Sequence, residues 1–198
     1  MPVLRMPRIP RYLVRLENRE GFTSKDGVTL LTNARSAVDH LGAVIRIVRV
    51  SSSAVEFDVF LPRSVLVEDL TKALSSIGSI KTLRRLDLEA PARPKDQVLA
   101  EANSLFNEER FWECHEALEQ IWRPETGKER ELQQGIILVA AAFVHQQRNR
   151  PKVCLSVMKR AYSKLKEFGG TYHGIDIDSL KSNIRRILDT EEIEMFKI

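Results

Sequence analysis

The stretch APARPKD, residues 90–96, divides the sequence into two parts with different hydrophobic periodicities. Its two prolines interrupt regular structure, and Asp96 is a suitable N-cap for a following helix. Before this stretch, short β-branched segments predict strands, whereas the apolar residues after it recur at helical spacing. The sequence therefore predicts two domains, residues 1–90 and 96–198, joined by a linker at residues 91–95.

The first part contains four segments with the alternating apolar pattern of β-strands. They are YLVRLE (12–17), AVIRIVRV (43–50), AVEFDVFL (54–61) and SIKTLRRLDL (79–88). Apolar residues at helical spacing lie between the first and second strands and between the third and fourth, and Gly42 and Gly78 follow them as helix stops. The resulting order β-α-β-β-α-β predicts a ferredoxin-like domain.

The second part predicts five helices and no strand. Their apolar positions fall within residues 98–106, 111–122, 132–144, 153–168 and 178–188. The short connections favour antiparallel neighbours in a bundle, and the third helix should be central because residues 136–144 are apolar on every side. The predicted fold class is therefore α+β: an N-terminal ferredoxin-like βαββαβ domain followed by an all-α helical bundle.

The composition is that of an ordinary globular chain of 198 residues, with 43% hydrophobic residues. Only two cysteines occur, Cys114 and Cys154, so we expect no disulfide framework and a reducing compartment. The N-terminal stretch MPVLRMPRIPRYLVRL contains three prolines, and it lacks both the apolar core of a signal peptide and a membrane span. We therefore expect a cytoplasmic protein without a membrane anchor.

The charge distribution does not favour nucleic-acid binding. Residues 1–90 carry 14 Lys and Arg against 10 Asp and Glu, whereas residues 91–198 carry 17 of each kind. An RNA-binding sheet needs aromatic residues on its open face, but the predicted solvent side of the third strand is Glu56, Asp58 and Phe60. We expect those acids to pair with arginines across the sheet. A protein partner or a second copy of the chain remains open.

The segment FWECHEALEQIW, residues 111–122, carries the candidate site. At about 100° per residue, His115 falls on the apolar face of this helix, beside Phe111 and Trp122. Glu119 lies close to that face, whereas Glu113 points roughly the opposite way. The sequence therefore predicts that His115 and Glu119 turn inward and that Glu113 turns outward.

Two interpretations of these residues are open. In the first, His115, Glu119 and His145 bind a divalent metal such as zinc, and Glu116 acts as a general base. In the second, His115, Glu119 and Gln134 form a buried polar network that stabilises the bundle. A tight antiparallel hairpin places His115 opposite about residue 135, roughly 15 Å from His145 at about 1.5 Å per residue. That spacing favours the network.

Two stretches of the helical part resemble a known family. FNEERFWECHEALEQIWRP (106–124) and ELQQGIILVAAAFVHQQRNRP (131–151) are similar to the helical family called domain of unknown function DUF309, whose members are often labelled predicted metal-dependent hydrolases. The resemblance covers residues 96–168. The matching positions are Phe111, His115, Glu116, Leu118, Glu119 and Trp122 in the first motif, and Gln134, Gly135, Ile137, residues 140–142 and His145 in the second.

This resemblance implies a site at His115, Glu116, Glu119 and His145. Two positions depart from the family pattern: Arg110 stands where a glycine-containing turn is common, and Asn149 replaces a glycine. Asparagine tolerates the left-handed conformation that such a turn requires.

Residues 16–47 resemble small-molecule-sensing ACT domains, with Gly21 as the matching glycine and with extra residues at 24–27. Three functions therefore stay open. The protein is a non-catalytic binding or assembly protein, which the helical geometry favours, or a metal-dependent hydrolase. In a third hypothesis, the N-terminal domain senses an effector or binds nucleic acid.

Overall fold

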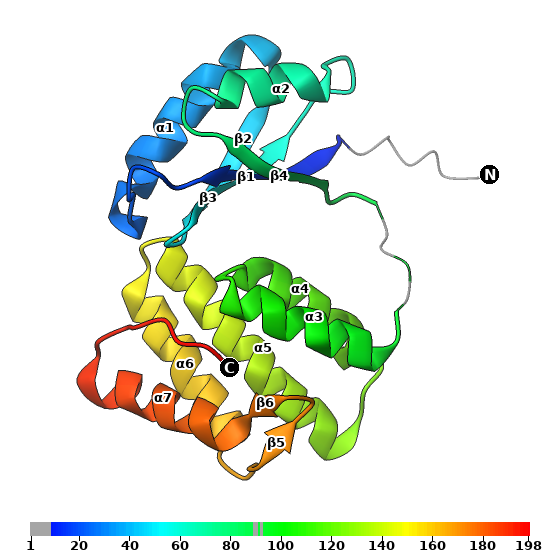
Figure 1. The fold of residues 1–198 in the computed structure, drawn as a ribbon, viewed down its shortest axis with the longest axis vertical. Helices are drawn as coiled ribbons and strands as arrows, with labels where there is room; N and C mark the ends of the chain where they lie inside the picture. The colour runs from blue at the N-terminus through cyan, green and yellow to red at the C-terminus, as the bar shows by residue number, and fades with distance from the viewer. Residues whose placement is uncertain (1–8, 89–90, 92) are drawn as a thin grey trace, which may run out of the picture. The chain divides into compact units, whose positions relative to one another are not determined.

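The computed structural model describes residues 9–88, 91 and 93–198, so the start of the N-terminal stretch and part of the predicted linker lie outside the described residues. The chain divides into two compact units, Met1–Ala90 and Pro91–Ile198 (Figure 1). Among the described helices, none is long and apolar enough to cross a lipid bilayer.

The first unit is a four-stranded antiparallel sheet with two helices on one face (Figure 1). The strand order β2-β3-β1-β4 is that of the ferredoxin-like arrangement. The strands are β1 (Arg11–Glu17), β2 (Val44–Val50), β3 (Ala54–Phe60) and β4 (Ile80–Arg85), and the helices are α1 (Gly27–Val38) and α2 (Val67–Leu74). Gly42 ends the α1 region with φ 63°, as predicted, but α2 ends at Leu74, before the expected stop at Gly78.

The helix-covered face of the sheet forms the core of the first unit. Alternate residues of β1 and β3, such as Val14, Phe57 and Val59, are fully buried against α1 and α2. This alternation follows from the period of two along a strand, which sends neighbouring side chains to opposite faces. The hydrophobic pattern of the sequence therefore determines the register of the sheet.

The other face of the sheet differs from the prediction, because Glu56 and Asp58 are buried, each with 2% exposure, instead of facing solvent. Arginines of neighbouring strands pair with both acids. Arg11 donates two hydrogen bonds to Asp58, and Arg15 and Arg49 lie 3.4 and 3.1 Å from the two Glu56 carboxylate oxygens. The expected pairing of these acids with arginines across the sheet is thus confirmed.

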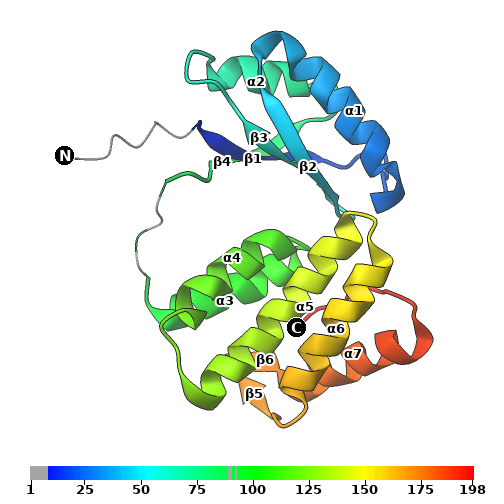
Figure 2. The ribbon, with the colours of Figure 1, turned by 180° about the vertical axis from the view of Figure 1, so that it is seen from behind.

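The second unit is a helical bundle with one short β-hairpin (Figure 2). Its helices are α3 (Lys95–Asn107), α4 (Phe111–Trp122), α5 (Gly127–Gln147), α6 (Pro151–Leu165) and α7 (Ile177–Thr190). The hairpin, β5 (Thr171–Tyr172) and β6 (Ile175–Asp176), was not expected in an all-α bundle. Pro94 is the N-cap of α3, so the predicted cap Asp96 lies in the first turn instead.

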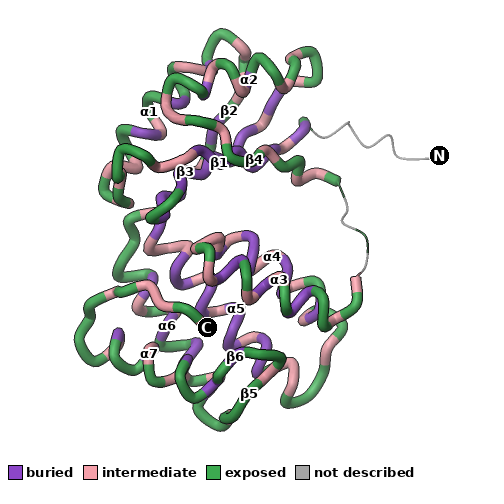
Figure 3. The backbone as a smooth tube through the Cα atoms, in the orientation of Figure 1, coloured by how far each residue is buried: buried purple, intermediate pink, exposed green. Residues whose placement is uncertain are grey.

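The long helix α5 contributes most to the core of the second unit. Ten of its residues are buried, and it packs against both α4 and α6. Figure 3 shows buried residues along α5 and in the helices next to it. Four aromatic rings cluster at one end of this core, with centroid separations of 4.8 to 5.9 Å: Phe106, Phe111, Phe143 and Phe196. The central position predicted for this helix is therefore confirmed.

Candidate functional site on helix α4

Helix α4 begins at a turn that side chains hold in place. Glu109 adopts the left-handed conformation with φ 59°, and Gln147 of α5 donates a hydrogen bond to its carbonyl oxygen at 2.7 Å. Arg110 donates two hydrogen bonds to the Glu113 carboxylate, at 2.8 and 3.0 Å. This pairing raises the pKa of Arg110. The turn without glycine is therefore built on Glu109 and stabilised by a charged pair.

Helix α4 ends at a second arginine contact. Arg130 lies 4.1 Å from the centre of the Trp122 ring, and its Nη1 donates to the carbonyl oxygens of Trp122, Arg123 and Glu125 at 2.9 to 3.1 Å. These groups lie at the end of the helix, where carbonyl oxygens lack intrahelical donors. Trp122 of the motif therefore positions Arg130, which stacks on its ring and caps the helix.

We expect Arg130→Met to lower the free energy of unfolding by about 1–3 kcal/mol, because hydrogen bonds from a charged donor contribute that much. Urea denaturation of both proteins measures the difference. Arg123→Met is the matched control: Arg123 is 71% exposed and pairs with Glu119 at the surface, so its loss should stay below about 1 kcal/mol. Equal losses in the two variants would contradict the capping role.

The rotation of α4 differs from the predicted one. The most deeply buried positions include Cys114 and Glu113, which are 0% and 3% exposed, whereas His115 retains 25% exposure of its side chain. The buried face is wider than the predicted stripe because α4 packs against both α3 and α5. Glu113 therefore points inward, where Arg110 pairs with it, and His115 lies at the edge of the buried face.

His115 lies between two carboxylates. Its Nδ1 is 3.6 Å from Oε1 of Glu116, and its Nε2 is 3.7 Å from Oε1 of Glu119. Both distances exceed the range of ordinary hydrogen bonds, so the interaction is electrostatic. The other oxygen of Glu119 accepts a hydrogen bond from Arg123 at 2.7 Å. These side chains are 25% to 45% exposed, in contrast to the buried network expected from the sequence.

The register between α4 and α5 decides which residues face His115. The rings of Phe111 and Phe143 are 4.8 Å apart, and Arg130 contacts Trp122 at the other end. These contacts place His115 level with about residue 139, instead of the predicted 135. Gln134 and His145 therefore lie roughly 8 and 9 Å along α5 from that level, in opposite directions, at about 1.5 Å per residue.

The donor groups around α4 do not gather into a cluster. Among the residues that the structure describes, no three His, Cys, Asp or Glu side chains are arranged to hold a metal ion. His145 is partly buried, and its Nδ1 has no hydrogen-bond partner among the described residues. Burial, together with Arg148 and Arg150, lowers its pKa. Both effects favour the neutral form of the His145 imidazole.

Both cysteines lie in the core of the helical unit. Cys114 and Cys154 are free thiols with no exposed surface. Burial raises the pKa of each thiol to about 12, so the nucleophilic thiolate is scarcely populated at neutral pH. Burial thus disfavours either thiol as a nucleophile.

Gly135 of the second motif has a packing role. A Cβ atom at this position would lie 2.6 Å from both Cγ and Cδ2 of the buried Leu165 of α6. Such a separation is far below van der Waals contact, so only glycine lets α5 and α6 approach this closely. The glycine thus fixes the spacing between two helices rather than a turn.

A polar network that the sequence patterns did not reveal lies at the hairpin. Lys95 contacts Glu125 and Glu129 at 2.5 Å each, Tyr172 donates to Glu129 at 2.8 Å, and Gln133 donates to Tyr172 at 2.9 Å. Burial raises the pKa of Tyr172 to about 12, and Lys95 lowers that of Glu129. The network connects α3, α5 and the hairpin. The sequence patterns did not reveal it because a two-residue strand is too short to show a periodic pattern.

The geometry defines the second unit as a helical bundle domain with paired motifs on α4 and α5. Residues 99–157 match the model of the domain of unknown function DUF309. The helical unit therefore resembles the DUF309 family, as the two motifs had indicated. The match lies entirely within the second unit.

Two relatives carry no assigned function. An uncharacterized protein of Aquifex aeolicus (strain VF5) is 25% identical over 118 residues, a match that covers 59% of this chain and 34% of the relative. The matched part of the chain thus spans about a third of that protein's length. A crystal structure of a conserved hypothetical protein from Thermus thermophilus is 35% identical, covers 50% of this chain and 99% of that chain, and has a TM-score of 0.42.

Proposed function

We propose that this protein is a non-catalytic binding protein whose helical unit is a structural scaffold. The observation that carries the proposal is that charged residues and the motif tryptophan of α4 are engaged in contacts that stabilise the helix. Arg110 holds Glu113, Arg123 holds Glu119, and Arg130 caps the helix over the Trp122 ring. Groups engaged in this way stabilise a helix, whereas a catalytic acid or base must reach a substrate proton.

A metal-dependent hydrolase is the second candidate. In its favour, His115 is partly exposed between two carboxylates, and the described part of the chain offers no hydrogen-bond partner to Nδ1 of His145. An ion at this site would use His115, Glu119 and His145, with Glu116 as the base. Zinc requires three or four ligands at about 2 Å, yet His145 lies roughly 9 Å along α5 from the level of His115. In the described part of the chain, no three His, Cys, Asp or Glu side chains could hold a metal ion together, which favours the binding function over the hydrolase.

The two proposed functions predict different metal contents of the purified protein. We expect the protein, purified without chelators, to contain far less than one zinc, manganese or iron ion per chain by plasma mass spectrometry. We expect His115→Ala to change the free energy of unfolding by less than about 1 kcal/mol, because the imidazole makes no ordinary hydrogen bond within the described structure.

The control for this experiment is His40→Ala, at an exposed position of the first unit. One ion per chain that is retained in His40→Ala and lost in His115→Ala would overturn the scaffold proposal and support the hydrolase. Substoichiometric metal in all three proteins would support the scaffold.

A further inference from the structure

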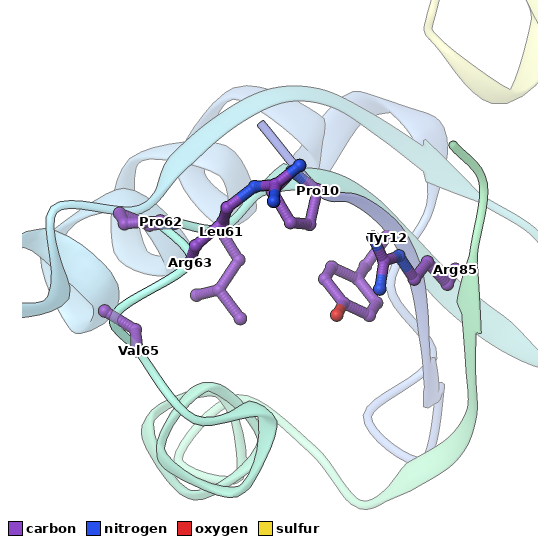
Figure 4. A pocket seen from close by; sticks show the side chains of 7 residues that line it. All are labelled: Pro10, Tyr12, Leu61, Pro62, Arg63, Val65 and Arg85. Carbon is purple, nitrogen blue, oxygen red and sulfur yellow. The ribbon is translucent and has the colours of Figure 1, made fainter. Parts of the chain in front are cut away.

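The first unit contains a hollow of about 280 Å³ at one end of its sheet (Figure 4). It lies where β1 begins, where β3 passes into the loop before α2, and where β4 ends. The lining residues are Pro10, Tyr12, Leu61, Pro62, Arg63, Val65 and Arg85. Its volume is close to the lower end of the range for ligand pockets, about 300–1,000 Å³. A small molecule is therefore the appropriate occupant.

The strand register places Tyr12 and Arg85 side by side in this hollow. They are directly paired residues of β1 and β4, so their side chains project from the same face of the sheet. Figure 4 shows both extending toward the hollow, with Leu61 and Val65 on the far side and Arg63 along its rim. Rigid strands thus hold an aromatic ring next to a guanidinium group.

The lining combines apolar surface with positive charge. Tyr12 and Leu61 are almost fully buried, whereas Arg63 and Arg85 are exposed, and none of the seven lining residues is acidic. Asp87, outside the lining, accepts hydrogen bonds from Nε and Nη2 of Arg85, both at 2.9 Å. Within the described structure, Nη1 of Arg85 makes no hydrogen bond, so this donor is available to a ligand.

We propose that this hollow binds a small organic carboxylate with a flat apolar body. The body would pack against Tyr12, Leu61 and Val65, and the carboxylate would accept hydrogen bonds from Arg63 and Arg85, whose planar guanidinium groups suit a carboxylate. The inference rests on the proposed binding function and names its ligand class. Gly21, the position suggested by the ACT resemblance, lies beyond the opposite end of β1, so the two sites are distinct.

The test uses the full chain, labelled with ¹⁵N, titrated with benzoate as the carboxylate probe and followed by amide chemical shifts. We expect saturable shifts at Tyr12, Val65 and Arg85. Benzamide, which has the same body without the charge, should bind at least tenfold more weakly, and so should inorganic phosphate, which has no apolar body.

Two variants alter the hollow, and one is a control. Arg63→Gln should weaken benzoate binding at least fivefold, and Val65→Phe, which fills the hollow without changing charge, should do the same. Arg19→Gln removes an exposed arginine of the same unit and should leave the affinity unchanged.

Absence of saturable shifts, equal binding of benzamide or phosphate, or equal weakening by Arg19→Gln would overturn the carboxylate site. None of these results depends on the metal content of the protein, which tests the scaffold proposal. Failure of the ligand inference is therefore distinguishable from failure of the scaffold proposal.

Discussion

Phe143→Ala is expected to lower the free energy of unfolding by about 3–5 kcal/mol, the range for truncating a buried aromatic residue. Phe143 has no exposed surface, and its ring lies 4.8, 5.2 and 5.8 Å from the rings of Phe111, Phe196 and Phe106. Removing it leaves a cavity and also separates aromatic pairs that contribute beyond the buried area. The loss approaches the total stability of many domains, about 5–15 kcal/mol.

Urea denaturation, followed by far-ultraviolet circular dichroism, measures this loss. Val153→Ala is the control, because Val153 of α6 is 41% exposed and its truncation should cost less than about 1 kcal/mol. A loss at Phe143 no larger than that at Val153 would contradict the central position of the aromatic cluster in the helical unit.

Gly135→Val is the second substitution for which we expect a large loss, about 1–3 kcal/mol or more. Even a single added carbon would lie 2.6 Å from the Leu165 side chain, so α5 and α6 would have to separate. Valine adds two further methyl groups at the same point of contact. Any gain in helix propensity over glycine, below about 1 kcal/mol, does not offset the clash.

A double-mutant cycle with Leu165→Ala isolates this contact. Leu165→Ala alone should be destabilising, because Leu165 is fully buried, but it also opens space beside Gly135. The double variant should therefore be more stable than the sum of the two single losses predicts. Additive losses in thermal and urea denaturation would show that the glycine does not control the distance between the helices.

Most of the secondary structure could be predicted from the sequence, because it follows local hydrophobic patterns. The alternating segments became β1 to β4, and the five helices appeared close to their predicted positions. Asn149 adopts the left-handed conformation, with φ 54°, as its place in the turn before α6 indicated. The β5–β6 hairpin was missed because each strand has only two residues, although His173 and Gly174 carry the positive φ angles of a tight hairpin turn.

Only part of the candidate site could be predicted from the sequence. The sequence placed His115, Glu116 and Glu119 next to one another, because residues three or four positions apart meet on one helix. It did not predict the inward position of Glu113, since a helical wheel contains no information about how many neighbours surround a helix. The capping role of Arg130 was also missed, because it depends on a contact between two helices.

The sequence by itself determined the two-part organisation, the order of strands and helices, and the family motifs of the helical unit. Only the tertiary structure decided which side chains meet across elements. Packing of Phe111 against Phe143 shifts α5 by about four residues relative to the expected hairpin, which changes the level of Gln134 and His145 relative to His115. Local periodicity fixes the face of a helix, whereas the register between two helices depends on how distant side chains interdigitate.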